Sequence, residues 1–530
     1  MKTLNIIFLF FLVLTSCASD NPVKSEELPQ IEVSKVVTQN SRTFIDVNGV
    51  AFPLFGAQIR LDALTLCDKL SISQIEEYFK KAQELGVNCV EVPIWWNLVE
   101  PQADQYEYTL VDKILGFALK YNLKIELLWF STNMCGDSFS YLVPQYVLNE
   151  PGKKLKRDNN GQFWNYYGYI FSLKLNDEWV LMREKKTVTN LFNHIRLWDS
   201  NNGDTHPVIT AQIHNEPDGL VRWRLDQYHI RYSDTDPLSK ADAWAMTLKA
   251  IDEVGKAVKA SSYKVVTRTN VVLGNGINGF YEFPQAKPSD IFSLEGIDIV
   301  CVDPYKSHIG EIKPEVLAYR SLNGNYPLIA ENKGVYTNTP TLMLATVALG
   351  GGYDIYDLAT SKFFINNTDN KDEIDHGVYT WDLKPKSHTA NVSKMLKGLV
   401  AAAPDIAKVP LADFAAFNIT EDNPQTSKVQ SIQTTHINIA FTTNSGALAF
   451  VADMGSYILV YATEKADFNF TNALFSNAEA GSYDAKGIFK VNNTLSLNNG
   501  VLTTDGGVLF RIGYSGASAL ASNTDSAIGR

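Results

Sequence analysis

Short apolar runs alternate with segments of helical periodicity from about residue 44 to about residue 399. In one clear repeat, Ser73 and Glu76 form a capping-box pattern that predicts the start of a helix, and Gly86 is a typical helix end. The apolar side chains between them share one helical face: Ile75, Phe79, Ala82 and Leu85. Residues 87–94 then form a run typical of a strand that is buried on both faces.

Eight apolar runs of this kind are candidate strands. They lie at 54–59, 89–94, 125–130, 208–214, 265–269, 297–302, 327–330 and 353–356. Alternating strands and helices predict a parallel sheet or barrel, and eight units suit a (β/α)8 TIM barrel with long loops. A doubly wound sheet would need fewer strands, and no glycine-rich phosphate-binding fingerprint follows the first one. We therefore expect residues 44–405 to form an α/β TIM barrel.

The pattern changes after about residue 410. Short alternating runs separated by Asn and Gly turns replace the helical periodicity, for example at 437–441 and 457–461. Such alternation predicts antiparallel strands. We therefore expect residues 406–515 to form a smaller β-sandwich domain and residues 516–530 to be a disordered tail.

A long insertion at 131–176 follows the third predicted strand. It is rich in aromatic residues, namely Tyr141, Tyr146, Phe163, Trp164, Tyr166, Tyr167 and Tyr169. Loops after barrel strands emerge on the catalytic face, so these rings are candidates for one wall of a binding cleft. A small satellite core that holds the insertion in place is an equally good interpretation.

The first 17 residues resemble an export signal. Lys2 precedes an apolar run at 4–14 that is too short for a permanent transmembrane helix. The segment 14–17 resembles a bacterial lipobox, in which the cysteine, here Cys17, is lipidated and becomes the new N-terminus. Residues 18–43 would then be a polar tether and lead-in, with membrane contact through the lipid only. A plain secretory signal with an incidental cysteine is the alternative.

Charge and cysteine spacing exclude some classes of function. The formal net charge is -11 and the pI about 5.3, which argues against a nucleic-acid partner because phosphate binding needs a basic face. The remaining cysteines are scattered, without C-x-x-C or a histidine at ligand spacing, so we expect no metal site. A disulfide between Cys67 and Cys135 is possible in an exported protein, but nothing in the sequence requires one.

The strongest chemical signal is the end of the fourth predicted strand. The apolar run at 208–213 leads into His214, Asn215, Glu216 and Pro217. The carboxylic acid of Glu216 would therefore lie at the C-terminal rim of the barrel, where barrel enzymes hold their catalytic groups.

This arrangement resembles the clan A glycoside hydrolases. In that clan the fourth strand ends in Asn-Glu, with the Glu as acid/base, and the seventh strand ends in a nucleophilic Glu. Glu331, within 325–334, matches the second position. The segments 55–58, 95–101 and 127–130 look most like the β-galactosidases of families 35 and 42 and related exported Bacteroidetes enzymes. The resemblance covers about 45–400 and departs at His214 and Pro217, which leaves the family and the sugar open.

The resemblance also implies roles for residues around the two acids. Asn215 would bind the sugar hydroxyl next to the anomeric carbon, and Tyr305 would orient Glu331. Trp129 and Trp381 end or follow barrel strands, and either could stack on a pyranose or simply pack in the core. Arg60 and His214 are polar groups at the rim that could reach the substrate. Glu91 and Glu126 lie within strands, and we interpret them as structural ion-pair partners.

Together these features predict a retaining exo-β-glycosidase, with a β-galactosidase as the first choice. It would cleave oligosaccharides or polysaccharides at the cell envelope without a cofactor, using two Glu residues in a double displacement. Two alternatives remain open. One is an endo-acting β-mannanase or glucanase on the same barrel, and the other is a catalytically silent glycan-binding lipoprotein.

The lipobox hypothesis predicts the behaviour of the exported protein. The wild-type protein should partition into the detergent phase of a Triton X-114 extraction, because a lipid on Cys17 and its new N-terminus would anchor it. The Cys17→Ser variant should stay in the aqueous phase. A wild-type protein that is aqueous, with a mature N-terminus at another residue, would show that the signal is an ordinary secretory one.

Overall fold

A computed structural model describes residues 28–158, 163–164, 168–272, 279–366, 374–483 and 488–515. The lipobox with Cys17 and the expected tail at 516–530 lie outside these residues. Within the described part of the chain, no helix combines the length and the apolar character needed to cross a membrane.

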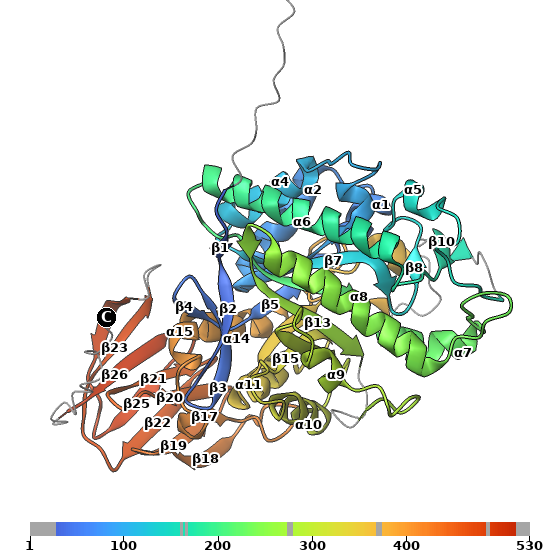
Figure 1. The fold of residues 1–530 in the computed structure, drawn as a ribbon. Helices are drawn as coiled ribbons and strands as arrows, with labels where there is room; N and C mark the ends of the chain where they lie inside the picture. The colour runs from blue at the N-terminus through green and yellow to red at the C-terminus, as the bar shows by residue number, and fades with distance from the viewer. Residues whose placement is uncertain are drawn as a thin grey trace, which may run out of the picture.

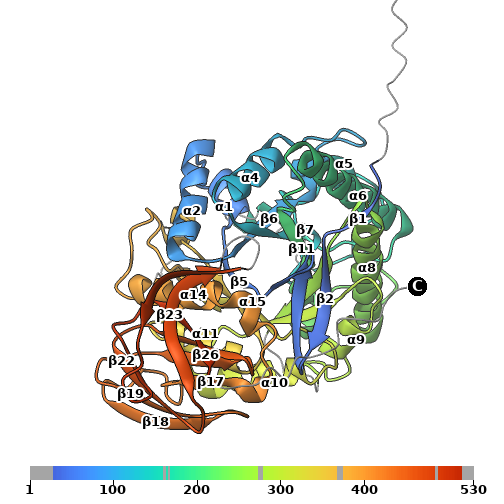
Figure 2. The ribbon, with the colours of Figure 1, turned by 90° about the vertical axis from the view of Figure 1, so that its left-hand side faces the viewer.

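Eight parallel strands close into a barrel, which confirms the predicted TIM-barrel fold (Figures 1 and 2). In barrel order they are β11 (Val208–Asn215), β13 (Val266–Val272), β14 (Ile299–Asp303), β15 (Leu328–Lys333), β16 (Gly352–Tyr356), β5 (Phe55–Gln58), β6 (Cys89–Trp95) and β7 (Lys124–Met134). Each coincides with one of the eight apolar runs. Their side chains are almost all buried, because the barrel interior covers one face and the surrounding helices cover the other.

The helices surround the barrel, as Figure 2 shows. The longer ones are α2 (Ile72–Leu85), α4 (Thr109–Lys120), α6 (Glu178–Asn201), α8 (Lys240–Ala260), α10 (Ile309–Arg320), α11 (Thr339–Ala348) and α14 (Thr389–Ala401). Short helices lie in the connections: α1 (Leu61–Leu66), α3 (Trp96–Val99), α5 (Gln145–Leu148), η2 (Leu220–Arg224), α7 (Leu225–Gln227), α9 (Pro288–Phe292), α12 (Lys362–Asn366), α15 (Ala403–Ile406) and η4 (Leu411–Asp413).

Helix α2 begins two residues earlier than its sequence pattern predicted. Its capping box consists of Ser71 and Gln74, so the expected pair of Ser73 and Glu76 was wrong. The same Ser-x-x-acid/amide spacing occurs in both registers, and the earlier one frees Glu76 to bind Lys120 on α4 at 2.5 Å. The helix does end at Gly86, whose φ of 99° is in the left-handed region.

The described part of the predicted lead-in, residues 28–43, is folded and contacts the barrel domain, whereas residues 18–27 of the predicted tether lie outside the described residues. Strands β2 (Ser34–Gln39), β3 (Arg42–Val47) and β4 (Val50–Phe52) form an antiparallel sheet, and β1 (Ile31–Glu32) pairs with β12 (Tyr263–Lys264). Apolar side chains of β3 pack against the lower ends of the barrel strands. This sheet covers the barrel floor, which would otherwise expose apolar side chains to water.

A β-sandwich follows the barrel, as expected. Its larger sheet has the order β17 (Phe414–Phe417), β20 (Ala449–Asp453), β21 (Tyr457–Ala462), β26 (Leu509–Tyr514), β23 (Phe475–Tyr483) and β24 (Phe489–Leu495). The smaller sheet has the order β18 (Lys428–Gln433), β19 (Asn438–Thr443), β22 (Ala466–Thr471) and β25 (Val501–Thr504). The first strand begins at Phe414, directly after the short helix η4, whereas α15 of the barrel domain ends at Ile406.

The larger sheet of the sandwich packs against the barrel domain on one face and against the smaller sheet on the other. Phe414 and Ala416 belong to the core that includes the barrel, whereas Ala415 and Phe417 belong to the core of the sandwich. This alternation follows from the two-residue period of a strand. The two domains therefore share a continuous apolar interface next to α14 and α11 (Figure 1).

The aromatic insertion forms a satellite sheet, which supports the second of its two interpretations. Strands β8 (Ser138–Phe139), β10 (Gly168–Phe171) and β9 (Phe163–Trp164) pair in that order. Its buried apolar side chains, including Phe139, Leu142 and Phe171, join the main core. The side chains of Phe163, Trp164, Tyr166 and Tyr167 lie outside the described residues, so their place in a cleft wall stays a prediction.

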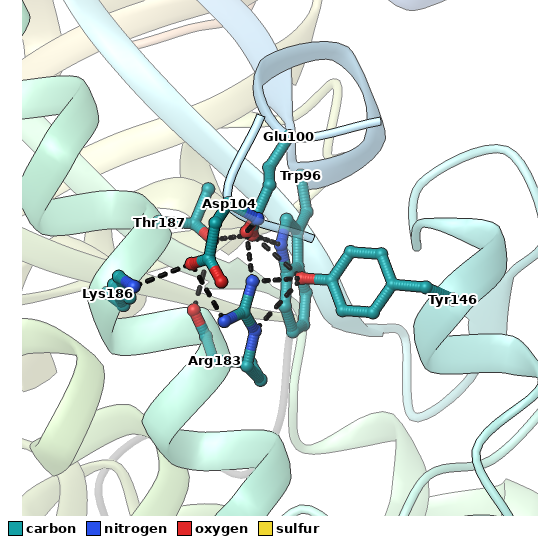
Figure 3. Close-up of polar contacts among 7 residues, drawn as sticks. All are labelled: Trp96, Glu100, Asp104, Tyr146, Arg183, Lys186 and Thr187. Carbon is teal, nitrogen blue, oxygen red and sulfur yellow. Dashed lines mark hydrogen bonds and ion pairs between the residues drawn. The ribbon is translucent and has the colours of Figure 1, made fainter. Parts of the chain in front are cut away.

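A buried carboxylate ties this insertion to the barrel, as Figure 3 shows. Glu100, which follows α3, is fully buried and accepts hydrogen bonds from Trp96 Nε1 at 2.9 Å and Tyr146 Oη at 2.8 Å. Arg183 and Thr187 of α6 contact the same carboxylate. Since a buried charge is tolerated only when it is paired and hydrogen-bonded, the network holds α3, α5 and α6 together.

The close fit of the two domains predicts opposite effects for one substitution at two helical glycines. A Cβ at Gly398 of α14 would lie 2.2 Å from Cε1 of Tyr461, whereas a Cβ at Gly116 of α4 would meet open space. Gly398→Ala should lower the free energy of unfolding by about 1–3 kcal/mol through overpacking. Gly116→Ala should raise it by about 0.5–1 kcal/mol because alanine favours the helix. Urea denaturation of both variants measures the difference, and equal effects would contradict tight docking at Tyr461.

Candidate active site

The two predicted acids meet at the C-terminal mouth of the barrel. Glu216 directly follows β11, and Glu331 is in β15. Their side chains are buried, with exposures of 8% and 5%, and oxygens of Glu216, Asp303 and Glu331 all lie within 4.8 Å of one another. Glu216 has a φ of 45°, an uncommon conformation for a residue with a side chain, and such strain is typical of functional sites.

Tyr305 contacts both acids, which confirms its predicted reach to Glu331. Its hydroxyl donates a short hydrogen bond to Glu331 Oε2. The hydroxyl oxygen of Tyr305 also lies 3.4 Å from Glu216 Oε1. The other oxygen of Glu331 accepts a hydrogen bond from Gln58 Nε2 at 3.0 Å. Gln58 ends strand β5, and the sequence analysis had assigned it no role.

Asn270 of β13 links the two sides of the mouth and was missed by the sequence analysis. Its Oδ1 accepts the backbone N–H of Glu216 at 3.2 Å. Its Nδ2 donates to Asn215 Oδ1 at 3.0 Å and to Asp303 Oδ2 at 2.6 Å. The predicted strand stopped at residue 269, whereas β13 continues to Val272 and so brings Asn270 into the site.

Asn215 lies at the mouth with an exposure of 7%. Its carbonyl oxygen is occupied by Gln212 Nε2 at 3.0 Å as well as by Asn270, so its amide nitrogen is directed away from both. That nitrogen lies 4.0 Å from Cys135 Sγ. Asn215 is therefore placed to donate a hydrogen bond at the mouth, and its contact with a sugar stays a prediction.

The surroundings give the two acids different protonation states. Burial, and then the charge of Glu331, raise the pKa of Glu216 to about 8, so this group is protonated at neutral pH. Burial also raises the pKa of Glu331, but hydrogen bonds from Tyr305 and Gln58 and the charge of Arg60 favour its ionised form. We therefore assign the proton of the pair to Glu216 and the negative charge to Glu331.

Asp303 is the third carboxyl group of the cluster. Burial, followed by the charges of Glu331 and Glu216, raises its pKa well above the ordinary value and so favours its neutral form. Three carboxyl groups at this spacing offer ligands for a cation. Each already accepts a hydrogen bond, however: Asp303 from Asn270, Glu331 from Tyr305 and Gln58, and Glu216 from Cys135.

Glu91 and Glu126 lie below the mouth as partners of Arg268, which confirms their structural interpretation. Arg268 of β13 is fully buried, donates to Glu91 through Nη2 and lies 3.4 Å from Glu126 through Nε. Glu126 also accepts a hydrogen bond from the thiol of Cys89 at 3.1 Å. These contacts keep both carboxyl groups in the barrel interior, away from the rim.

The proposed substrate contacts of Trp129 and His214 were wrong. Both side chains are 0% exposed, and both bind Glu184 of α6: Trp129 Nε1 at 3.1 Å and His214 Nε2 at 3.0 Å. Ser131 and Thr132 contact the same carboxylate. The buried charge of Glu184 needs hydrogen-bond donors, and it draws these polar groups outward to the helix instead of into the mouth.

Trp381 and Arg60 remain on the catalytic side. Trp381 is 41% exposed and lines a cavity of about 610 Å³ with Tyr78 and Phe363, and Lys362 Nζ lies 4.6 Å from its ring centre. Arg60 forms two hydrogen bonds with Asp62, at 2.9 and 2.7 Å, so its guanidinium is held at the rim.

Cys135 contacts the acid directly, and no sequence signal identified it. Its thiol donates to Glu216 Oε2 at 2.7 Å. Cys135 forms no disulfide, so the possible Cys67–Cys135 bond is not present.

Comparisons with known proteins assign no family to this chain. Residues 246–424 match a family model described as a domain of unknown function, DUF4978. This stretch contains Tyr305 and Glu331 and excludes Glu216. No curated protein matches the chain.

Several solved glycosidase structures are similar in fold. An exo-β-1,4-mannosidase from Opitutaceae bacterium strain TAV5 has 13% identity and a TM-score of 0.47, covering 70% of this chain and 63% of that one. A β-galactosidase from Halorubrum lacusprofundi has 11% identity and a TM-score of 0.47, covering 66% and 58%. A β-galactosidase from Marinomonas ef1 has 12% identity and a TM-score of 0.48, covering 68% and 62%. The chain thus spans about three fifths of each of these proteins, and the function must be inferred from the site itself.

Proposed function

We propose that this protein is a retaining glycoside hydrolase with Glu216 as acid/base and Glu331 as nucleophile. The observation that carries the proposal is a pair of buried carboxyl groups with oxygens within 4.8 Å of each other. Different neighbouring groups act on the pKa of each acid. Retaining enzymes need carboxyl groups about 5–5.5 Å apart, whereas inverting enzymes need about 6.5–9.5 Å to admit a water molecule. A pair of oxygens within 4.8 Å is compatible with the shorter spacing and so supports retention.

In the first step, the carboxylate of Glu331 attacks the anomeric carbon, and the glycosidic bond breaks. The leaving oxygen takes the proton of Glu216, which becomes a carboxylate. In the second step, Glu216 removes a proton from water, and the water oxygen attacks the anomeric carbon. The bond to Glu331 then breaks, and both acids return to their starting states. Tyr305 contacts both carboxyl groups and holds the nucleophile in position.

For the substrate we propose β-linked oligosaccharides, with β-galactosides as the first choice. The sequence resemblance at 55–58, 95–101 and 127–130 supports this choice. Asn215 would donate to the hydroxyl next to the anomeric carbon. With a lipid on Cys17, the enzyme would act at the cell envelope. Hydrolysis of a panel of nitrophenyl β-glycosides identifies the preferred sugar. Faster hydrolysis of another glycoside than of the galactoside would contradict the choice of β-galactosides.

The mechanism predicts two different rescue products. Glu331→Ala should abolish turnover of an aryl glycoside, and azide should then enter the vacated site and yield a glycosyl azide of inverted configuration. Glu216→Ala should lower turnover of a substrate that needs acid assistance by about 10²–10⁴-fold. Azide should then attack the covalent intermediate and give a product of retained configuration. Proton NMR of the glycosyl azides distinguishes the two anomers.

The matched control is Glu295→Ala, because the Glu295 side chain is 84% exposed and pairs only with the surface residue Lys256 in the described part of the chain. It should keep wild-type turnover. Near-normal activity of Glu331→Ala or Glu216→Ala, or the same anomer from both, would show that Glu216 and Glu331 are not the catalytic pair.

We also propose that Trp381 binds a sugar unit distant from the cleaved bond. Its exposed ring lines a cavity built from the first and last βα loops, with Tyr78 and Phe363 beside it. Stacking is worth about 0.5–1.5 kcal/mol, so Trp381→Ala should raise KM for a long oligosaccharide about 2- to 12-fold. KM for a nitrophenyl monosaccharide should not change. An equal rise for both substrates would place Trp381 at the cleaved sugar instead.

A further inference from the structure

Cys135 occupies a backbone position that is fixed by two elements. It follows β7, and its N–H donates to the carbonyl of Asn215 at 2.8 Å, which extends the pairing of β7 with β11 by one residue. Its φ of 52° is in the left-handed region, which non-glycine residues seldom adopt. The turn directs the residue toward the end of β11, where Glu216 begins the next loop.

Two glycines hold the loops of Cys135 and Glu216 in contact. A Cβ at Gly219 would lie 2.3 Å from the carbonyl oxygen of Cys135, and a Cβ at Gly136 would lie 2.2 Å from the backbone nitrogen of Leu220. Each position therefore needs a residue without a side chain. This mutual fit leaves the thiol little freedom to move away from the acid.

The thiol meets one oxygen of the acid, and a different group meets the other. Sγ of Cys135 lies 2.7 Å from Glu216 Oε2, whereas Tyr305 Oη lies 3.4 Å from Oε1. Burial, followed by the charge of Glu216, raises the pKa of the Cys135 thiol well above its ordinary value. At neutral pH the thiol is therefore a proton donor to Glu216 and not a thiolate.

We propose that Cys135 is a positioning residue for the acid/base, which holds Glu216 by a weak hydrogen bond. The inference rests on the proposed function of Glu216. A double displacement needs this group to be an acid in the first step and a carboxylate in the second. A strong donor would stabilise the carboxylate form of Glu216 and lower its pKa, so that the proton needed in the first step would be lost. A thiol is a weak donor, which orients the carboxyl group with little effect on its pKa.

The groups that face Glu216 determine in which direction its pKa should change when Cys135 is replaced. Glu331 on β15 and Asp218 after β11 favour the protonated form, and Tyr305 favours the carboxylate. Cys135 from the loop after β7 also favours the carboxylate. Removing its hydrogen bond should therefore raise the pKa of Glu216 above about 8, and a hydroxyl in its place should restore or lower it.

The test compares Cys135→Ala and Cys135→Ser with the wild-type protein. The Glu216 carboxyl is titrated by NMR with carbon-13-labelled glutamate, and Glu216→Gln identifies its signal. We expect the pKa to increase in the order Ser, Cys, Ala, with an upward shift of about 0.5–1 unit for Ala. The alkaline limb of kcat/KM against pH should move in the same order, while the acidic limb, which reports Glu331, should keep its position.

Titration of Glu216 at the wild-type pH in both variants, or a fall in the alanine variant, would overturn the proposal. The serine variant keeps a hydrogen-bond donor at the same position, so it remains informative if the alanine variant does not fold. The NMR titration needs no turnover. A wild-type protein without glycosidase activity would therefore refute the proposed function, whereas the order of the three pKa values judges the role of Cys135 separately.

Discussion

Negative charge buried in the barrel is the constraint on which the site depends. Arg268 is fully buried among Glu91, Glu126 and Asp354, and Asp303, Glu331 and Glu216 lie above them at the mouth. An interior of low dielectric disfavours the ionised form of a carboxyl group, so each additional buried acid is held against a rising electrostatic cost. Burial accordingly raises the pKa of Glu91, Asp354, Asp303 and Glu216.

The same constraint distinguishes the two acids of the proposed mechanism. Both are buried, but Glu331 receives hydrogen bonds from Tyr305 and Gln58, whereas Glu216 has the thiol of Cys135 at one oxygen. Glu331, which accepts the shorter hydrogen bond from Tyr305 and another from Gln58, is the group that ionises. Its negative charge then favours the protonated form of Glu216. The distinction arises from the polar groups that three other barrel strands, β5, β7 and β14, bring to the mouth, and not from the two glutamates themselves.

Outside the barrel, two further buried carboxylates organise the loops of the catalytic side. Glu184 accepts hydrogen bonds from Trp129, Ser131, Thr132 and His214. Glu100 binds side chains from α3, α5 and α6 (Figure 3). Burying each carboxylate has an unfavourable desolvation free energy. The network also fixes the positions of the partner side chains, because losing one partner would leave a buried charge unpaired. Trp129, Ser131 and Thr132 lie in β7, which ends at Met134, so the strand held by Glu184 leads into Cys135.

The amino-acid sequence by itself determined the eight barrel strands, the sandwich, and the places of Glu216, Glu331 and Tyr305. Apolar periodicity encodes which segments are strands, and the end of a parallel strand must lie at the rim. Periodicity says nothing of which distant side chains meet, so Gln58, Asn270 and Cys135 entered the site only when the barrel closed. Burial by a helix likewise decided that Trp129 and His214 serve Glu184, because a polar group at a strand end can point into the mouth or outward. That choice depends on partners far away in the chain, and only the tertiary structure contains them.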